Sequence, residues 1–117
     1  MSTFTPQKDR SPVKLETEPQ PTTDQIALVS VLRALSETVR LQIVLILATD
    51  GEQTCGPLAE RLGLPQSTLS HHLRQLRESG VTQSQRDGTL RRMSVRSGDL
   101  AERFPGLLNA VLAAASQ

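Results

Sequence analysis

The sequence predicts a mainly α-helical domain with one small β-hairpin, in the order helix, helix, helix, helix, hairpin, helix. Apolar residues recur at the three- and four-residue spacing of helices over most of residues 24–112. Two short segments, 81–85 and 90–96, flank Asp87-Gly88, a residue pair that favours a hairpin turn. The length, 117 residues, is that of one domain with a short extension.

The extension is the N-terminal tail, residues 1–23, which we expect to be disordered. It contains four of the seven prolines and few large apolar residues, so it buries too little apolar surface to offset the entropy of ordering. The folded domain is expected over residues 24–115. A core of this size is modest, and a homodimer would add buried surface.

The composition also bears on location. No apolar run approaches the roughly 18 residues of a membrane-spanning helix, and the polar N-terminus does not resemble a secretion signal. We therefore expect a soluble, cytoplasmic protein without a membrane partner.

The first two predicted helices lie between Asp24 and Gly51. Asp24 suits an N-cap, and apolar residues follow it at helical spacing to Ala34. Ser36 opens a second helix, whose run 41–48 is almost entirely apolar before Gly51 ends it. A helix that is apolar on every face is typically the central one.

A short helix and a longer one follow, joined by a tight turn. The short helix is expected from 56 to 62, after Thr54 as a cap, and Gly63 ends it. Pro65 suits the first position of the longer helix, which Gly80 ends. The apolar stripe of the longer helix consists of Leu69, Leu73 and Leu76.

The last third of the chain is predicted to form the hairpin and one final helix. The hairpin would have Asp87-Gly88 as its two-residue loop. The final helix would begin with a cap at 97–99 and kink at Pro105-Gly106. Two helices joined by a short glycine-bearing turn and followed by a hairpin form a winged helix-turn-helix, whose second helix enters the major groove of DNA.

Positive charge is concentrated where such a fold would contact DNA. Residues 61–96 contain seven arginines against two acidic residues, a net charge of +5, whereas 24–60 carry −3 and 97–117 carry −1. A polyanion-binding surface requires this placement. The alternative is a solvated face in an arginine-rich protein.

We expect the DNA contacts on the outer face of the longer helix and in the hairpin. Serine and threonine lower helix propensity, which a merely solvated face has no reason to accept. Charge on a hairpin edge can also serve to discourage aggregation. The expected contact residues are Gln66, Ser67, Thr68, Ser70, His71, Arg74, Arg77, Arg86, Arg91 and Arg92.

The residues 62–80, LGLPQSTLSHHLRQLRESG, resemble the signature of the ArsR/SmtB family of winged-helix transcriptional regulators. The resemblance extends from about Ile26 to Leu112 and includes the run 35–41 at the start of the second helix. It implies an operator-binding homodimer that pairs through its first and last helices and releases DNA when an inducer, often a metal ion, binds. The expected interface residues are Ile26, Val29, Leu100, Phe104, Leu108, Val111 and Leu112.

The sequence departs from the family pattern at both metal sites. Where the family has ELCVCDL, residues 52–58 read EQTCGPL, so Thr54 and Gly56 occupy the thiolate positions and Cys55 falls between them. The last helix offers Asp99 and Glu102 but no histidine. Carboxylates alone are a poor site for zinc, nickel or cobalt, so we expect no metal and no cofactor.

The remaining metal- or redox-capable residues have ordinary alternatives. His71 and His72 are adjacent, about 100° apart on a helix, unlike a chelating pair four residues apart. We expect His72 to pack and His71 to face outward. Cys55 beside a helix start could act as a redox sensor, but a packed thiol is the commoner role.

Together these features predict a sequence-specific transcriptional regulator that binds a palindromic operator as a homodimer, with repression favoured and activation left open. A protein-interaction adaptor on the same scaffold is one alternative. A sensor with a non-standard metal or thiol site is another. No catalytic constellation is evident, so an enzyme is not expected. A separate sensor protein remains open as a partner.

Overall fold

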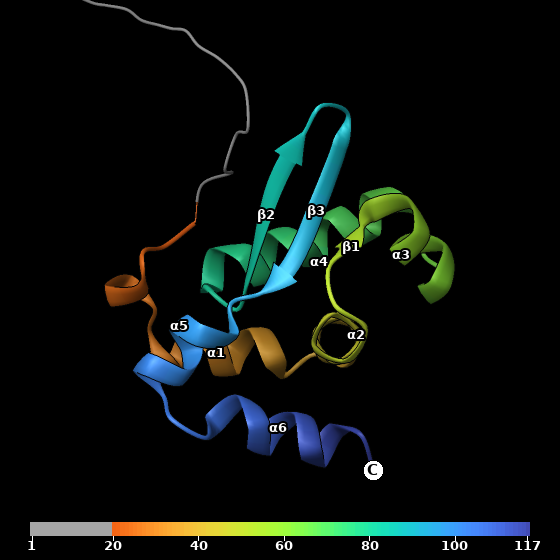
Figure 1. The fold of residues 1–117 in the computed structure, drawn as a ribbon. Coiled ribbons are helices and arrows are strands. Elements are labelled where there is room, and N and C mark those ends of the chain that lie inside the picture. The colour runs from red at the N-terminus through yellow and green to blue at the C-terminus, as the bar shows by residue number, and fades with distance from the viewer. Residues whose placement is uncertain (1–19) are drawn as a thin grey trace, which may run out of the picture.

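The computed structural model describes residues 20–117, and most of the predicted tail lies outside this part. Figure 1 shows a hairpin that projects from a group of helices, with the C-terminal helix on the side opposite the hairpin. The elements are η2 Thr23–Gln25, α1 Leu28–Leu35, α2 Thr38–Asp50, β1 Gln53–Thr54, α3 Cys55–Leu62, α4 Gln66–Ser79, β2 Thr82–Asp87, β3 Leu90–Val95, α5 Ser97–Arg103 and α6 Leu107–Ala115. The predicted fold class, a mainly helical winged helix-turn-helix, is confirmed.

The sheet has three strands rather than the two that the sequence predicted. Its order is β1-β3-β2, and all neighbours are antiparallel. In β1, Gln53 pairs with Met93 and Thr54 with Arg92. A two-residue strand is too short to show an alternating pattern, so only its pairing with β3 reveals it.

The hairpin turn lies one residue later than predicted. Asp87 pairs with Leu90, so the loop is Gly88-Thr89 and not Asp87-Gly88. Gly88 has a φ of 65°, and both tight hairpin turns require a positive φ at the first loop residue. The glycine therefore fixes the register.

Three predicted helix boundaries also change. Asp24 lies in the 3-10 turn η2, and α1 begins only at Leu28. Pro65 precedes the first residue of α4 as its N-cap. The prediction of a single kinked C-terminal helix was wrong. The helices α5 and α6 are separate, because Gly106 adopts a φ of 84° between them. No helix in the described residues has the length and apolar character needed to cross a membrane.

The core is built around α2, as its apolar sequence predicted. Ile43 and Val44 have no exposed surface, and α2 packs against α1, α4, α6 and β3. Leu69, Leu73 and Leu76 of α4 are buried in the same cluster. The winged helix-turn-helix therefore rests on one shared core.

The junction between α4 and β2 is unusually close to the N-terminal part of the domain. Gly80 ends α4 in the left-handed conformation, with a φ of 86°. An added Cβ at this position would lie 2.6 Å from Cγ1 of Ile26, a buried side chain. Only glycine allows the end of α4 to approach Ile26 in this way.

We expect Gly80→Ala to destabilise the domain more than Gly63→Ala does. Both glycines have positive φ, so each alanine costs about 1–2 kcal/mol of backbone strain. A Cβ added to Gly63 would have no atom within 4 Å, whereas Gly80→Ala adds an overpacking cost of about 1–3 kcal/mol. Urea unfolding of the two variants measures the difference, and equal decreases in stability would contradict the close approach.

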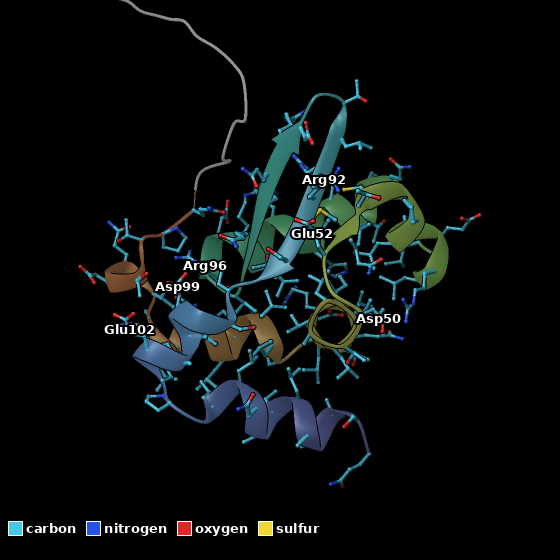
Figure 2. All side chains as sticks on the ribbon, in the orientation of Figure 1. Asp50, Glu52, Arg92, Arg96, Asp99 and Glu102 are labelled. Atoms are coloured by element: carbon cyan, nitrogen blue, oxygen red, sulfur yellow. The ribbon has the colours of Figure 1, made fainter. Side chains whose placement is uncertain are left out.

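A buried arginine connects the N-terminal segment to the start of α5 through hydrogen bonds. Arg96 is 7% exposed, and it donates to Asp99 Oδ2 at 2.9 Å and to the carbonyl oxygen of Pro21 at 2.6 Å. Thr23 donates to the other carboxylate oxygen of Asp99 at 2.8 Å. These two hydrogen bonds, from Thr23 first and then from Arg96, lower the pKa of Asp99 below its ordinary value. Figure 2 shows Arg96 and Asp99 close together at the base of the hairpin.

We expect Asp99→Asn to destabilise the domain at neutral pH, with a penalty that shrinks on acidification. A carboxyl group whose pKa is lowered by folding stabilises the fold above its ordinary pKa, about 4, and this contribution is lost as the pH falls through the folded pKa. Thermal unfolding from neutral pH to about pH 3 measures the gap between the variant and the wild type.

The matched control for this prediction is Asp24→Asn, since Asp24 is an exposed aspartate of the same segment. That variant should follow the wild type over the whole pH range. A gap between Asp99→Asn and the wild type that stays constant with pH would show that the charge of Asp99 does not stabilise the fold.

Candidate nucleic-acid interface

The helix-turn-helix consists of α3 and α4, joined by the turn 63–65. Gly63 caps α3 in the left-handed conformation, with a φ of 68°. The leucine stripe of α4 turns one face of this helix into the core, so the opposite face is left to solvent. The orientation of α4 follows directly from this burial.

The outer face of α4 carries six of the predicted contact residues, and all six are exposed. These residues are Gln66, Ser67, Thr68, Ser70, His71 and Arg74. Their side chains supply both hydrogen-bond donors and acceptors, which is what reading base edges requires. The structure thus brings the helical part of the predicted site together on one surface.

Arg77 does not belong to this surface. It is only 9% exposed, because it lies four residues after Leu73 and therefore on the buried side of α4. The prediction that it contacts DNA came from its charge and ignored its place on the stripe. We exclude it from the interface.

The two histidines of α4 differ as the sequence indicated. His71 is exposed, and its Nδ1 lies 3.5 Å from Nη2 of Arg74. His72 is packed, with 14% of its side chain exposed, and its Nδ1 lies 3.8 Å from Oε1 of Glu37. Glu37 caps α2 by accepting the backbone N–H of Arg40 at 2.8 Å, which lowers the pKa of this carboxyl. His72 therefore packs at the place where α4 lies against the start of α2.

The hairpin, or wing, places two arginines opposite each other. Arg86 of β2 and Arg91 of β3 are direct partners in the strand register, and like charges at such positions repel. Arg92 lies close to two acidic groups, Glu52 at 3.9 Å and Asp87 at 3.6 Å. A polyanion bound along the wing would be attracted by both guanidinium groups of the opposed pair.

A groove of about 430 Å³ connects the wing with the helix-turn-helix. It contains four predicted contact residues: Gln66, Ser70, Arg86 and Arg91. Thr89 and Leu90 at the tip of the wing, and Thr54 to Pro57 at the start of α3, complete its lining. The sequence analysis missed these residues, since only the turn register and β1 bring them to the groove.

The arginine count of residues 61–96 overstates the charge available at this surface. Arg77 and Arg96 are buried, and Arg61 pairs with Asp50 at 2.6 Å. Arg92 lies 3.9 Å from Glu52 (Figure 2) and 3.6 Å from Asp87, so part of its charge is neutralised by these acidic groups. Of the remaining arginines of this segment, Arg74 and Arg86 are exposed and Arg91 is half-buried.

The residues predicted to form a dimer interface fall into three groups by their exposure. Ile26 and Leu100 are 1% and 2% exposed within one chain, so they leave almost no surface for a second one. Val29 is 62% exposed. Four others are half-buried at the edge of the core: Phe104, Leu108, Val111 and Leu112. Leu28 and Leu32, each 44% exposed on α1, extend the apolar surface and were missed.

The residues aligned with the family metal sites have other contacts. The Sγ atom of Cys55 lies 3.9 Å from Sδ of Met93, so the thiol packs against β3. Asp99 is engaged by Arg96 and Thr23. No group of three or more histidine, cysteine or acidic side chains with metal-binding geometry occurs among residues 20–117.

Comparison with known proteins finds transcriptional regulators throughout. A family described as "Helix-turn-helix domain" matches residues 35–84. YceK of Bacillus subtilis, an uncharacterized HTH-type transcriptional regulator, is 33% identical over 86 residues, which cover 73% of this chain and 85% of YceK. The arsenic resistance transcriptional regulator ArsR1 of Pseudomonas putida is 36% identical over 58 residues, 50% of this chain and 45% of ArsR1. The structure of HlyU from Vibrio cholerae superimposes with a TM-score of 0.64 at 29% identity, covering 76% of this chain and 91% of HlyU.

Proposed function

The chain belongs to the ArsR/SmtB family of winged-helix transcriptional regulators, and from this premise we propose that it binds a palindromic operator as a homodimer through α4 and the wing. DNA-binding transcriptional regulation is the function of the family. Because the proposed target is chromosomal DNA, its place is the bacterial cytoplasm. The observation that carries the proposed contacts is the opposed pair Arg86 and Arg91 beside the exposed polar face of α4.

The two parts of the interface have different chemistry and therefore different tasks. The outer face of α4 is rich in neutral donors and acceptors, such as Gln66 and Ser70, which suit base edges in the major groove. The wing presents Arg86 and Arg91, whose guanidinium groups suit phosphates. We assign base reading to α4 and backbone contacts to the wing.

The dimer is supported by the apolar surface of α1. Among the described residues, four large apolar side chains are highly exposed, and three of them lie on α1: Leu28, Val29 and Leu32. A contiguous exposed apolar face indicates a protein partner, and a second copy would cover the same face on both chains. Such a dimer would present two α4 helices to half-sites about one helical turn apart, or a multiple of it.

The signal that releases DNA is not assigned to either family metal site. The thiolate positions hold Thr54 and Gly56, and the C-terminal site would have only Asp99 and Glu102. Asp99 is already bound by Arg96 and Thr23. The signal must then enter through a partner protein or through another ligand site of this chain.

Replacing residues of α4 and of the wing should weaken DNA binding in different ways. Ser70→Ala or His71→Ala should cost about 1–3 kcal/mol on the operator and much less on random duplex, because α4 reads bases. Arg86→Ala should weaken both duplexes alike and lower the salt slope by about one unit for each phosphate that it no longer neutralises. Titrations at several salt concentrations, on an operator selected from random fragments by the purified protein, measure both effects.

Two further measurements control this experiment. Arg61→Ala removes an exposed arginine that pairs with Asp50 and should leave both affinities unchanged. Arg86→Ala should also keep a free energy of unfolding within about 0.5 kcal/mol of the wild type, since Arg86 is exposed. Equal decreases in affinity for operator and random duplex in the α4 variants would contradict base reading by this helix. Failure of the wild type to bind any duplex would favour an adaptor.

A charge on the apolar face of α1 should separate the dimer. Leu32→Glu would place a carboxylate in an apolar interface without a partner, at a cost of several kcal/mol, and Val111→Glu should act in the same way. Leu90→Glu is the matched control, because Leu90 is similarly exposed, at 47%, but lies on the wing. Analytical ultracentrifugation measures the mass, and an unchanged dimer in Leu32→Glu would contradict this interface.

A further inference from the structure

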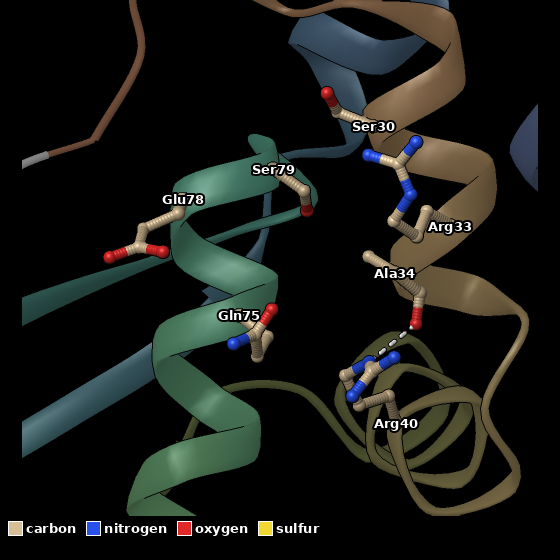
Figure 3. Close-up of a pocket in the computed structure, with 7 residues that line it drawn as sticks. All are labelled: Ser30, Arg33, Ala34, Arg40, Gln75, Glu78 and Ser79. Atoms are coloured by element: carbon tan, nitrogen blue, oxygen red, sulfur yellow. Dashed lines mark hydrogen bonds between the residues drawn. The ribbon is translucent and has the colours of Figure 1, made fainter.

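A second cavity lies between the dimer helix and the DNA-reading helix. It has a volume of about 220 Å³. Its walls are Ser30, Arg33 and Ala34 of α1, Arg40 of α2, and Gln75, Glu78 and Ser79 of α4. Figure 3 shows the two arginines on one side of this cavity and Gln75 facing them from α4.

Arg40 is held in place by one hydrogen bond. Its Nε donates to the carbonyl oxygen of Ala34 at 2.8 Å, near the end of α1. This bond fixes the plane of the guanidinium group and does not use the two terminal nitrogens. Among the described residues, neither terminal nitrogen has a hydrogen bond or ion pair.

The cavity carries an excess of positive charge. No carboxylate of the described residues lies within ion-pair distance of Arg33 or Arg40. Glu78 is the acidic residue of the lining, and its carboxylate points away from both arginines (Figure 3). Glu37, near Arg40, is the cap of α2 and accepts that residue's backbone N–H. Two guanidinium groups therefore line one cavity, and the only carboxylate described as acting on them is that of Glu37, which interacts with Arg40 beyond ion-pair distance. An anion that enters the cavity would be attracted by both arginines.

The position of each arginine can be explained separately by its interaction with the end of α1, but their shared position in one cavity cannot. Arg33 lies in the last turn of α1, where a cation favours the helix dipole, and Arg40 satisfies a carbonyl of the same helix. Neither role requires both side chains to line one cavity together with the amide of Gln75 and the hydroxyl of Ser30.

We infer that this cavity binds a small oxyanion, a carboxylate or phosphoryl group on a body of few atoms. Guanidinium groups bind both kinds of oxyanion through paired hydrogen bonds, and Gln75 and Ser30 add neutral donors. The cavity is smaller than the roughly 300 Å³ at which sites for drug-sized ligands begin, so the ligand is compact.

The position of the cavity gives the anion a regulatory role, which rests on the proposed function. An anion held by Arg33 and Gln75 would bridge α1, the proposed dimer helix, and α4, the proposed DNA-reading helix. It would bind most tightly to the one arrangement of these helices that closes the cavity around it. Binding would then shift the DNA affinity by that difference.

Nuclear magnetic resonance titrations of the full chain with inorganic phosphate and, separately, with succinate test the site. Sodium chloride keeps the ionic strength constant. We expect saturable shifts of the Arg33 and Gln75 side-chain signals at millimolar concentration, and the tighter of the two probes identifies the preferred oxyanion. Arg33→Gln should weaken binding at least tenfold, and the matched control Arg61→Gln should not change it. Absence of saturable shifts with both probes, or unchanged binding in Arg33→Gln, would overturn the inference.

The regulatory role has its own test, in which DNA affinity is measured in phosphate or succinate against chloride at equal ionic strength. The anion should shift the affinity of the wild type severalfold and leave that of Arg33→Gln unchanged. A wild-type affinity that is the same in all three salts would overturn the regulatory role. A decrease in DNA affinity of Arg33→Gln in chloride alone would show that Arg33 contacts DNA, and would overturn it too. A wild type that binds no DNA would refute the proposed function, while the titrations without DNA would still decide whether the anion site exists.

Discussion

The burial of one stripe of α4 is the constraint on which the rest of the structure depends. Leu69, Leu73 and Leu76 have between 0% and 2% of their surface exposed, and they fix the rotation of α4 about its axis. This rotation exposes the polar face and turns Arg77 inward. It also sets the position of Gly80, from which β2 and the wing continue. A change in this packing would move both parts of the interface together.

The N-terminal segment reinforces the same arrangement, both inside the core, through Ile26, and at the surface. Ile26 fills the space left by the missing side chain of Gly80, and its carbonyl oxygen accepts two hydrogen bonds from Arg103 of α5, at 2.8 and 3.2 Å. Arg96 binds the carbonyl of Pro21 in a similar way. Two arginines therefore hold the segment in place instead of adding their charge to the interface. Such bonds are strong because each joins a charged donor to a partly buried carbonyl.

The sequence predicted the parts of the fold that depend on local patterns. The helical order, the central position of α2 and the ends of α3 and α4 at glycines all follow from periodicity and from positive φ. Three features do not follow from local patterns: the strand β1, the turn register and the separation of α5 from α6. Strand pairing decides the first two. The third depends on the positive φ of Gly106. For the interface, the pattern located the exposed face of α4 but could not distinguish the exposed Arg74 from the buried Arg77. Their charges are identical, and only the leucine stripe separates them.

The two ends of α4 border different sites, and the buried leucine stripe runs between them. Its first turns carry the neutral polar residues at the groove, whereas its last turns, at Gln75 and Ser79, form one wall of the cavity beside α1. Because a helix with one buried face moves as a rigid body, a small displacement at the cavity is transmitted to the residues at the groove. The helix α1, which we propose as the dimer helix, forms the opposite wall, so in the proposed dimer the same displacement would also change the spacing between the two α4 helices. Since both half-sites of an operator must fit at once, affinity depends steeply on that spacing. The control that we propose would therefore require no change in the interface residues themselves, only in the distance between α1 and α4.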